Sequence, residues 1–280
     1  MGRSRATVEL MTSQEEKAER FRALHERPEP FLIPNPWDPG TARLLAGLGF
    51  EALATTSLGV ANMLGRTRAS AAEVLDNCRA IVAATPLPVN ADLENGYADD
   101  PAGVADTLRL ALGAGLAGCS VEDATGREDD PIYDAGLAAE RVRAAAEVAH
   151  RGPVHLVLTA RAENYLHGRP DLADTIARLQ AYQEAGADVL YAPGLRRLED
   201  ITRLAASVDR PVNVLAVAGA PPVAELAAAG VSRVSVGGAF AFAALGAVVE
   251  AARELSEQGT YAFWERARSG ARAADSAFGS

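Results

Sequence analysis

Three carboxylates in the sequence are spaced so that they can meet at one point. Asp92 and Glu94 stand two residues apart at the end of a short apolar run, so on a strand their side chains face the same way. Glu122 ends the next apolar run along the chain. Clustered carboxylates repel one another unless a cation lies among them, and oxygen ligands that leave room for water suit Mg²⁺, with Mn²⁺ as the other choice. The pattern predicts a metal site of Asp92, Glu94 and Glu122; the alternative is that these residues cap helices and form ion pairs.

A single arginine ends a later apolar run and brings a positive charge to this region. Arg161 carries a planar guanidinium, which can hold a substrate carboxylate through two parallel hydrogen bonds. Its alternative role is a structural ion pair with Glu163 or Glu122. We expect Arg161, Glu122 and Asp92 to form the catalytic group.

Other polar residues near the ends of apolar runs are candidates for binding substrate. The Ser57 hydroxyl and the amides of Leu58 and Gly59 could form a small nest for an anion, although a plain polar turn is the alternative. Asn213 interrupts an apolar strand, where it either satisfies the backbone or contacts substrate. Trp37 follows the first run and completes the predicted substrate-binding set.

The elements that must position these side chains alternate regularly. Short β-like runs and helical segments follow one another about eight times, and glycines mark where helices end before the next strand. Eight such units predict an α/β fold, a (β/α)₈ TIM barrel whose catalytic groups lie at the carboxyl ends of the strands. The predicted strands span 31–37, 52–57, 88–94, 118–123, 154–163, 189–193, 211–216 and 233–238. The predicted helices span 39–48, 71–84, 101–115, 134–150, 171–186, 196–207, 221–229 and 239–257.

The two ends of the chain lie outside this repeat. We predict a single barrel domain over 1–280, with a leading helix in 1–30, the barrel in 31–257 and a C-terminal helix or tail in 258–280. Ser13-x-x-Glu16 is a capping box that opens the leading helix, which runs to about Arg27. The last helix has no strand to return to, so we expect it to pack on a partner subunit, in a dimer or tetramer.

Composition excludes several classes of protein. The net charge of −10 disfavours nucleic acid and anionic membranes as partners, because both attract lysine and arginine. Lys17 is the only lysine and lies near the N-terminus, which argues against Schiff-base aldolases, pyridoxal-phosphate enzymes and Walker A nucleotide binding. The residues before Arg20 are polar and charged, so no signal peptide is expected and the cytoplasm is the predicted location.

Cysteine and histidine spacings give no sign of a soft metal site. Cys78 and Cys119 stand in apolar stretches without a C-x-x-C pattern and are expected to be buried thiols in a reducing compartment. The histidines are His25, His150, His155 and His167, and none forms an H-x-H or H-E-x-x-H pattern. This argues against a zinc site with histidine ligands.

Five segments resemble motifs of the isocitrate lyase/phosphoenolpyruvate mutase superfamily, in the same order over about residues 31–245. Pro88-Val-Asn-Ala-Asp92-Leu-Glu94-Asn-Gly96-Tyr97 is similar to its metal-binding segment, and Val121-Glu122-Asp123 to its I-E-D strand. Thr159-Ala-Arg161-Ala-Glu-Asn is similar to its A-R-T-D segment. Thr56-Ser57-Leu58-Gly59 and Pro211-Val-Asn213-Val resemble its substrate turn and its P-x-N strand.

The resemblance implies a fold, a cofactor and a class of reaction. Members are (β/α)₈ barrels, often tetramers that exchange a C-terminal helix, which bind Mg²⁺ and form or break a C–C or P–C bond beside a pyruvate-like enolate. By resemblance, the Mg²⁺ shell comprises Asp92, Glu94 and Glu122, and the 2-oxo acid is held by Arg161, Ser57 and the amides of Leu58 and Gly59. We therefore predict a lyase that cleaves a C–C bond of a small 2-oxo or 2-hydroxy di- or tricarboxylate, by retro-aldol cleavage or decarboxylation.

Two departures from the superfamily pattern keep alternatives open. Lyases of the superfamily carry a cysteine-containing loop after the fourth strand, whereas Ala124–Tyr133 here has no Cys, Lys or His. The stretch after the second strand, Leu64-Gly-Arg66-Thr-Arg68, is basic where an acidic residue is usual. For a base, Glu128, Asp129, Tyr133 or His167 are candidates. The alternatives are phosphonopyruvate-type P–C chemistry, in which Arg66 and Arg68 would hold a phosphonate, and a protein that binds 2-oxo acids without turnover.

Overall fold

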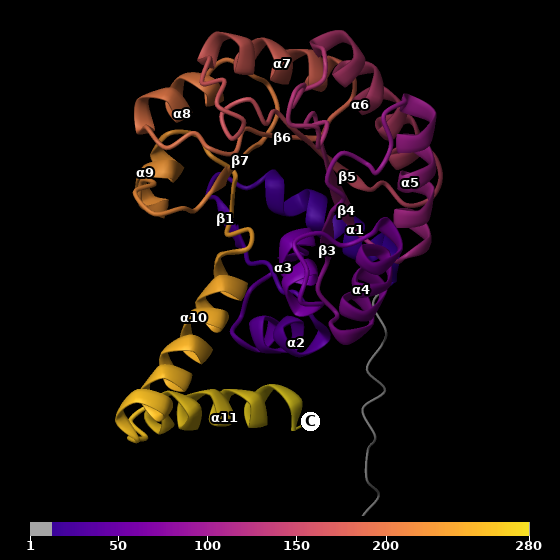
Figure 1. The fold of residues 1–280 in the computed structure, drawn as a ribbon. Coiled ribbons are helices and arrows are strands. Elements are labelled where there is room, and N and C mark those ends of the chain that lie inside the picture. Colours follow the sequence, from indigo (N-terminus) through magenta and orange to yellow (C-terminus); the bar gives the residue numbers. More distant parts are fainter. Residues whose placement is uncertain (1–12, 280) are drawn as a thin grey trace, which may run out of the picture.

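Eight parallel strands form a nearly closed barrel with helices around it (Figure 1). The computed structural model describes residues 13–279. The strand order is β1-β8-β7-β6-β5-β4-β3-β2, and a backbone hydrogen bond of 3.0 Å from Ala54 N to Pro34 O joins β2 to the chain just after β1. The strands are β1 (Phe31–Ile33), β2 (Leu53–Ala54), β3 (Val89–Asp92), β4 (Gly118–Glu122), β5 (Val157–Arg161), β6 (Val189–Tyr191), β7 (Val212–Leu215) and β8 (Arg233–Ser235).

The predicted barrel is confirmed, and each predicted strand is shorter than expected. The polar ends of the apolar runs leave the ladder and form their own hydrogen bonds at the mouth of the barrel. Asn35, beyond β1, donates to the Thr55 carbonyl at 2.9 Å and accepts from the Gly237 amide at 2.8 Å. The strand ends are therefore held by side chains across the barrel rather than by continued pairing.

The helices follow the strands around the outside of the barrel. Gly115 and Gly186 take φ values of +80° and +108° just after α5 and α7, a conformation that glycine adopts without strain as a helix ends. The helices are α1 (Gln14–His25), α2 (Pro39–Gly47), α3 (Ser57–Met63), α4 (Ala71–Ala84), α5 (Pro101–Gly113), α6 (Ala135–Ala149), α7 (Leu172–Glu184), α8 (Leu198–Ala205), α9 (Val223–Ala228), α10 (Ala239–Arg253), the π-helix η1 (Glu254–Gln258) and α11 (Trp264–Phe278).

The expected turn at Ser57–Gly59 is wrong, because these residues begin a helix. Thr56 is the N-cap of α3, and its hydroxyl accepts a hydrogen bond from the Gly59 amide at 3.2 Å. The sequence analysis placed a strand over 52–57, whereas β2 ends at Ala54 and Thr56 already caps the helix.

The leading helix closes the amino end of the barrel. Its capping box forms as predicted, with Ser13 and Glu16 bonded reciprocally. Phe21 and Leu24 of α1 are buried in one cluster with Val157 and Val189, the first residues of β5 and β6. A larger apolar core lies between the strands and the outer helices, and it contains Cys78 and Cys119, which are buried as expected.

The C-terminal helices leave the barrel. In Figure 1, α10 extends away from the strands and α11 turns back beneath α2. The end of α11 touches α2 of the same chain, where Phe278 and Ala277 lie against Gly40 and Gly47. Ala241 is the one buried residue of α10. Within residues 13–279, no helix is both long and apolar enough to cross a membrane.

Candidate active site

A cavity of about 810 Å³ opens among the carboxyl ends of the strands. Its walls contain the three carboxylates and the arginine that the sequence singles out, together with three of the predicted substrate-binding residues. The lining includes Asp92, Glu94, Glu122, Arg161, Ser57, Leu58 and Asn213. The fold therefore gathers most of the predicted site at the end of the barrel where it was expected.

Arg161 is the centre of the charged cluster. Its Nη1 lies 3.0 Å from Asp92 Oδ1, and its Nη2 lies 3.0 Å from Glu122 Oε2 and 2.7 Å from Glu163 Oε1. Register explains the contact, because Glu122 and Arg161 are partners in the β4–β5 ladder. The side chains of Arg161 and Glu122 are each 16% exposed. The ion pairs weighed as the alternative role thus form, while the guanidinium still faces the cavity.

Asp92 is fixed by the start of α3. Both the Ser57 amide and the Ser57 hydroxyl donate to Asp92 Oδ2, at 3.1 and 2.9 Å. Ser57 therefore orients a carboxylate in this structure instead of presenting a free anion nest. A carboxylate held from two sides in this way keeps its lone pairs in a fixed direction.

Two predicted substrate-binding residues do not line the cavity. The Gly59 amide is taken by Thr56 Oγ1, and a side chain at Gly59 would collide with Thr56 and with the Cβ of Trp37, at 2.6 and 2.9 Å. Trp37 instead lies against Gly59 in the first turn of α3. The assignment of Gly59 rested on a turn, and in the helix that replaces it the Gly59 amide bonds to Thr56 instead of facing the cavity.

Glu94 reaches the cavity by a different route from the one expected. It lies beyond β3, in the left-handed region with φ of +48°, so the alternation of a strand does not set its direction. Its carbonyl accepts a hydrogen bond from the Glu122 amide at 2.9 Å, which ties the two segments together. Glu94 therefore lines the cavity as expected, but not through the strand alternation from which this was predicted.

The cluster holds more negative charge than its arginine balances. Burial raises the pKa of Glu122 well above its usual range, an effect that Arg161 opposes and that Glu163 and Asp92 add to. Burial and then Asp92 raise the pKa of Glu94. A divalent cation fits such a site, because it would offset the carboxylates that Arg161 leaves unbalanced.

The arrangement limits how that cation can be held. In the part of the chain that the structure describes, the oxygens of Asp92, Glu94 and Glu122 do not lie together within 4.8 Å, the spacing of a closed three-ligand group. Such a cation would take few protein ligands directly, with water and substrate oxygens as the rest, which is the way that Mg²⁺ is usually bound. The assignment of Asp92, Glu94 and Glu122 to the metal remains a prediction.

A buried aspartate that was not among the predicted site residues supports the cluster from behind. Asp123 is 2% exposed and accepts hydrogen bonds from the Glu163 amide at 2.7 Å and from the Tyr182 hydroxyl at 2.6 Å. Arg178 Nη1 lies 3.2 Å from Asp123 Oδ2, the oxygen that also accepts from Tyr182. Asp123 thereby positions Glu163, which in turn holds Arg161. The signal was the Glu-Asp pair at the end of β4.

A buried arginine lines the cavity, and no feature of the sequence pointed to it. Arg233 is 3% exposed and donates to Asn213 Oδ1 at 2.8 Å and to Thr159 Oγ1 at 2.9 Å, and its Nη1 lies 3.3 Å from His25 Nε2. Burial lowers the pKa of Arg233 to about 9. Asn213 also donates to Ser235 at 3.0 Å, so its amide is committed to the protein on both sides.

The segment after β4 folds over one side of the mouth. Ala124 and Ile132 form a bridge that closes this loop, and Ala124, Thr125 and Gly126 line the cavity. Tyr133 does not line the cavity, but its hydroxyl donates to Asp99, which does. Among the four groups weighed as a base, only His167 lines the cavity. Arg68 lines it as well, whereas Arg66 pairs with Glu73 at 2.8 Å outside.

Comparison with known proteins identifies a family and several relatives of this chain. The model of the phosphoenolpyruvate phosphomutase family matches residues 21–256. A solved structure of a Burkholderia cenocepacia J2315 protein, provisionally described as a lyase/mutase, is 55% identical with a TM-score of 0.89 and covers 90% of this chain and 92% of its own. An uncharacterized protein of Mycobacterium tuberculosis H37Rv is 33% identical over 85% of this chain and 89% of its own. Oxaloacetate decarboxylase of Chromohalobacter salexigens is 30% identical over 86% of each chain.

Proposed function

The chain belongs to the phosphoenolpyruvate phosphomutase family, within the isocitrate lyase/phosphoenolpyruvate mutase superfamily, and from that premise we propose its reaction. It is an enzyme of the carbon–carbon lyase type. We propose that it uses Mg²⁺ to cleave a C–C bond in a small 2-oxo or 2-hydroxy di- or tricarboxylate. The observation that carries this proposal is the cavity in which Arg161 faces Asp92, Glu122 and Glu163.

In the cluster, one residue provides the charge that binds substrate and others hold the charged side chains in position. Arg161 supplies the positive charge next to which a substrate carboxylate can lie, because its guanidinium remains on the cavity wall. Ser57 keeps Asp92 oriented, and Glu163 keeps Arg161 in place through contacts at 2.7 and 2.8 Å. When bound, Mg²⁺ supplies a Lewis acid that polarises the 2-oxo group and stabilises the enolate oxygen.

Of the two C–C cleavage reactions, decarboxylation of an oxaloacetate-type acid requires the fewest catalytic groups from these residues. The bond from C3 to the distal carboxylate breaks, CO₂ leaves, and the electron pair forms the enolate of pyruvate, which is then protonated at C3. Arg161 offsets the negative charge that grows at the C1–C2 end. No cysteine is needed in the loop after β4, in agreement with its composition. The 30% identical relative named oxaloacetate decarboxylase supports this choice of substrate class.

A second reaction is favoured by one observation. Arg68 lines the cavity and brings a second cation to the mouth, where a phosphonate group could bind. Phosphonopyruvate-type P–C chemistry is therefore the alternative, and ³¹P NMR of phosphonopyruvate mixed with the enzyme would reveal it. Turnover of oxaloacetate to pyruvate without any change in the phosphorus spectrum would favour the lyase.

The first test is calorimetric titration of oxalate with and without Mg²⁺. Oxalate is a flat dianion with the shape of the pyruvate enolate, so tight binding is expected only when Mg²⁺ is present. Asp92→Asn should weaken the Mg²⁺-dependent binding by about 100-fold or more, because a neutral amide no longer attracts the cation. Asp106→Asn, at an exposed pair with Arg109 on α5, is the matched control and should bind as the natural chain does. Oxalate binding that ignores Mg²⁺, or that survives Asp92→Asn, would refute the metal assignment.

We propose a second copy of this chain as the protein partner. Large apolar side chains on the two C-terminal helices are exposed. Trp264 of α11 is 56% exposed, and five residues of α10 are 39% to 65% exposed: Phe240, Phe242, Leu245, Val248 and Val249. An apolar face of this extent on two helices outside the barrel is typical of an interface between subunits. Light scattering should give a dimer or tetramer, and Val248→Glu should shift it toward the monomer.

A further inference from the structure

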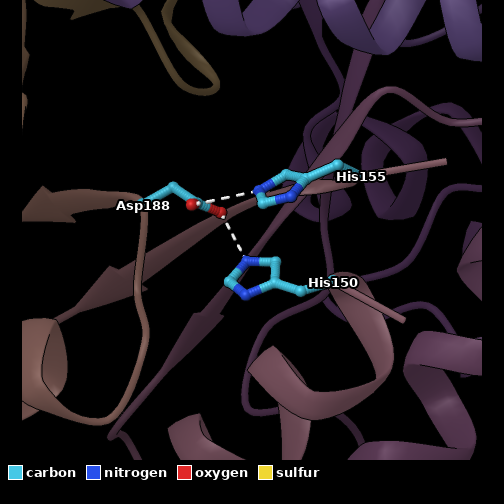
Figure 2. Close-up of side chains that lie close together, drawn as sticks. All are labelled: His150, His155 and Asp188. Atoms are coloured by element: carbon cyan, nitrogen blue, oxygen red, sulfur yellow. Dashed lines mark hydrogen bonds and ion pairs between the residues drawn. The ribbon is translucent and has the colours of Figure 1, made fainter. Parts of the chain in front are cut away.

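Three potential metal ligands lie together at the amino end of the barrel, opposite the active site. His150 caps the end of α6, His155 precedes β5 by two residues, and Asp188 stands immediately before β6. Figure 2 shows both imidazole rings turned toward the one carboxylate. Within residues 13–279, this is the only group of three His, Cys, Asp or Glu whose ligand atoms all lie within 4.8 Å of one another.

The geometry of this group is well defined. His150 Nε2 lies 2.9 Å from Asp188 Oδ2, and His155 Nε2 lies 3.2 Å from Asp188 Oδ1. The two rings are stacked, with centroids 4.1 Å apart and planes within 14°. The Leu158 amide donates to Asp188 Oδ2 at 2.8 Å, which anchors the carboxylate to β5. All three side chains are partly exposed, at 29%, 44% and 23%, so an ion can enter from solvent.

The separations between these ligand atoms are close to those of a tetrahedral metal site. With bonds of about 2.0–2.1 Å, neighbouring ligand atoms on a tetrahedral zinc lie about 3.3 Å apart. The two N···O separations of 2.9 and 3.2 Å are close to that edge, so small movements would admit an ion. Both Nε2 atoms present a lone pair to it when the ring protons sit on Nδ1.

We propose that His150, His155 and Asp188 bind a zinc ion, with water as the fourth ligand. Two imidazoles and one carboxylate form a donor set that suits Zn²⁺ and not Mg²⁺, which prefers oxygen. The sequence argues against such a site because no short histidine pattern exists. The fold supplies the third ligand from a position 33 residues beyond His155, across α7.

The bound ion would act on the scaffold and not on the reaction. It would tie the end of α6 to the chain before β5 and to the start of β6, three segments that otherwise meet through the hydrogen bonds of Asp188. A ligand that binds the folded chain alone raises its stability by mass action. The expected signature is therefore a higher midpoint of thermal unfolding in zinc, without any change in the requirement for Mg²⁺.

Equilibrium dialysis against ZnCl₂ tests the site, with bound zinc measured by mass spectrometry. Mg²⁺ is present in large excess so that it competes with zinc for the active-site carboxylates. The natural chain should retain about one zinc per chain, and His155→Ala and Asp188→Asn should each weaken retention by at least about tenfold. His167→Ala removes an exposed histidine at the other end of the barrel and should leave retention unchanged.

Thermal unfolding in the same samples gives the second measurement. Zinc should raise the midpoint of the natural chain and of His167→Ala, and it should leave His155→Ala where it was. His155 is the most exposed of the three, so this variant tests the ligand even if Asp188→Asn folds poorly. The proposal is wrong if the natural chain retains no zinc, or if His155→Ala retains as much as the natural chain. It is equally wrong if retention is lost in Asp92→Asn instead, because the ion would then sit in the active site.

Discussion

The two ends of the barrel carry two charged clusters of opposite construction. At the carboxyl end, Arg161 is surrounded by Asp92, Glu122 and Glu163, an assembly of oxygens with one guanidinium. At the amino end, two imidazoles share the single carboxylate of Asp188. Strand β5 connects them, since it ends at Arg161 and begins just after His155. The donor types predict which ion each end attracts, oxygens for Mg²⁺ and nitrogens for Zn²⁺.

The clusters also differ in how deeply they are buried and how firmly they are held. The side chain of Glu163 is 4% exposed, whereas that of His155 is 44% exposed. The mouth cluster has its own support, with Ser57 on Asp92 and Asp123 on Glu163. The amino-end cluster is anchored by the Leu158 amide. Breaking a contact at the mouth should therefore cost far more than breaking one at the amino end.

The largest effect is expected from Arg161→Met. The substitution removes the one cation that lies against Asp92, Glu122 and Glu163, and leaves these carboxylates buried together without compensation. Removing one partner of a buried ion pair typically costs about 3–5 kcal/mol, so urea unfolding near neutral pH should show a loss of that size. Activity should fall by at least about 100-fold, because the charge that binds the substrate carboxylate is gone.

Arg109→Met is the matched control for this experiment. Arg109 pairs with Asp106 on the surface of α5, where both side chains are more than half exposed. Such a pair contributes little, so stability and activity should not change. If Arg161→Met proved as stable as the control, the mouth cluster would not depend on its arginine, and the contrast between the two ends would fail.

The second-largest effect concerns His25, which is buried at the amino end, unlike the partly exposed His150 and His155. Burial, and then Arg233, lower the pKa of His25 to about 3 in the folded chain. The unfolded chain binds a proton near pH 6.5, so the unfolded state takes up more protons between these values. The stability that comes from neutral His25 is complete above pH 6.5 and is lost as the pH falls toward 3. From pH 7 to pH 4 this group should remove about 3 kcal/mol from the free energy of unfolding.

His25→Gln measures that contribution, because glutamine can keep hydrogen bonds near the Phe21 carbonyl and Arg233 but does not titrate. Urea unfolding at pH 7, 5.5 and 4 should show a shallower acid slope for the variant than for the natural chain. Parallel slopes for the two proteins would mean that the acid loss arises elsewhere, for example from the partly exposed cluster at Asp188.

The sequence was sufficient to predict the features that follow from the repeating strand–helix unit. Each buried parallel strand appears as an apolar run, and the barrel fold then requires the residues that follow each run to meet at one mouth. The positions of Asp92, Glu122 and Arg161 could be predicted from this rule alone, and all three line the cavity. Arg161 contacts Glu122 because their strands are neighbours in the same register.

The sequence was not sufficient where direction depends on local backbone or on distant partners. The left-handed φ of Glu94 and the first turn of α3 change where side chains and amides point without changing the apolar pattern. Arg233 is a cation inside a barrel, with hydrogen bonds to residues on three other elements. His150 and Asp188 are 38 residues apart, a separation that no short motif covers.

The smallest effect is expected from His155→Ala in the absence of zinc. Exposed ion pairs and hydrogen bonds contribute about 0–1 kcal/mol, and the His155 side chain is 44% exposed at 3.2 Å from Asp188. Asp188 keeps its bonds to His150 and to the Leu158 amide in this variant, so no buried group is left without a partner. Urea unfolding after treatment with a chelator should place the variant within about 0.5 kcal/mol of the natural chain, and zinc should then widen the gap. A large loss without zinc would show instead that the histidine–aspartate contacts are structural in themselves, and the amino end would then resemble the mouth in its dependence on each side chain.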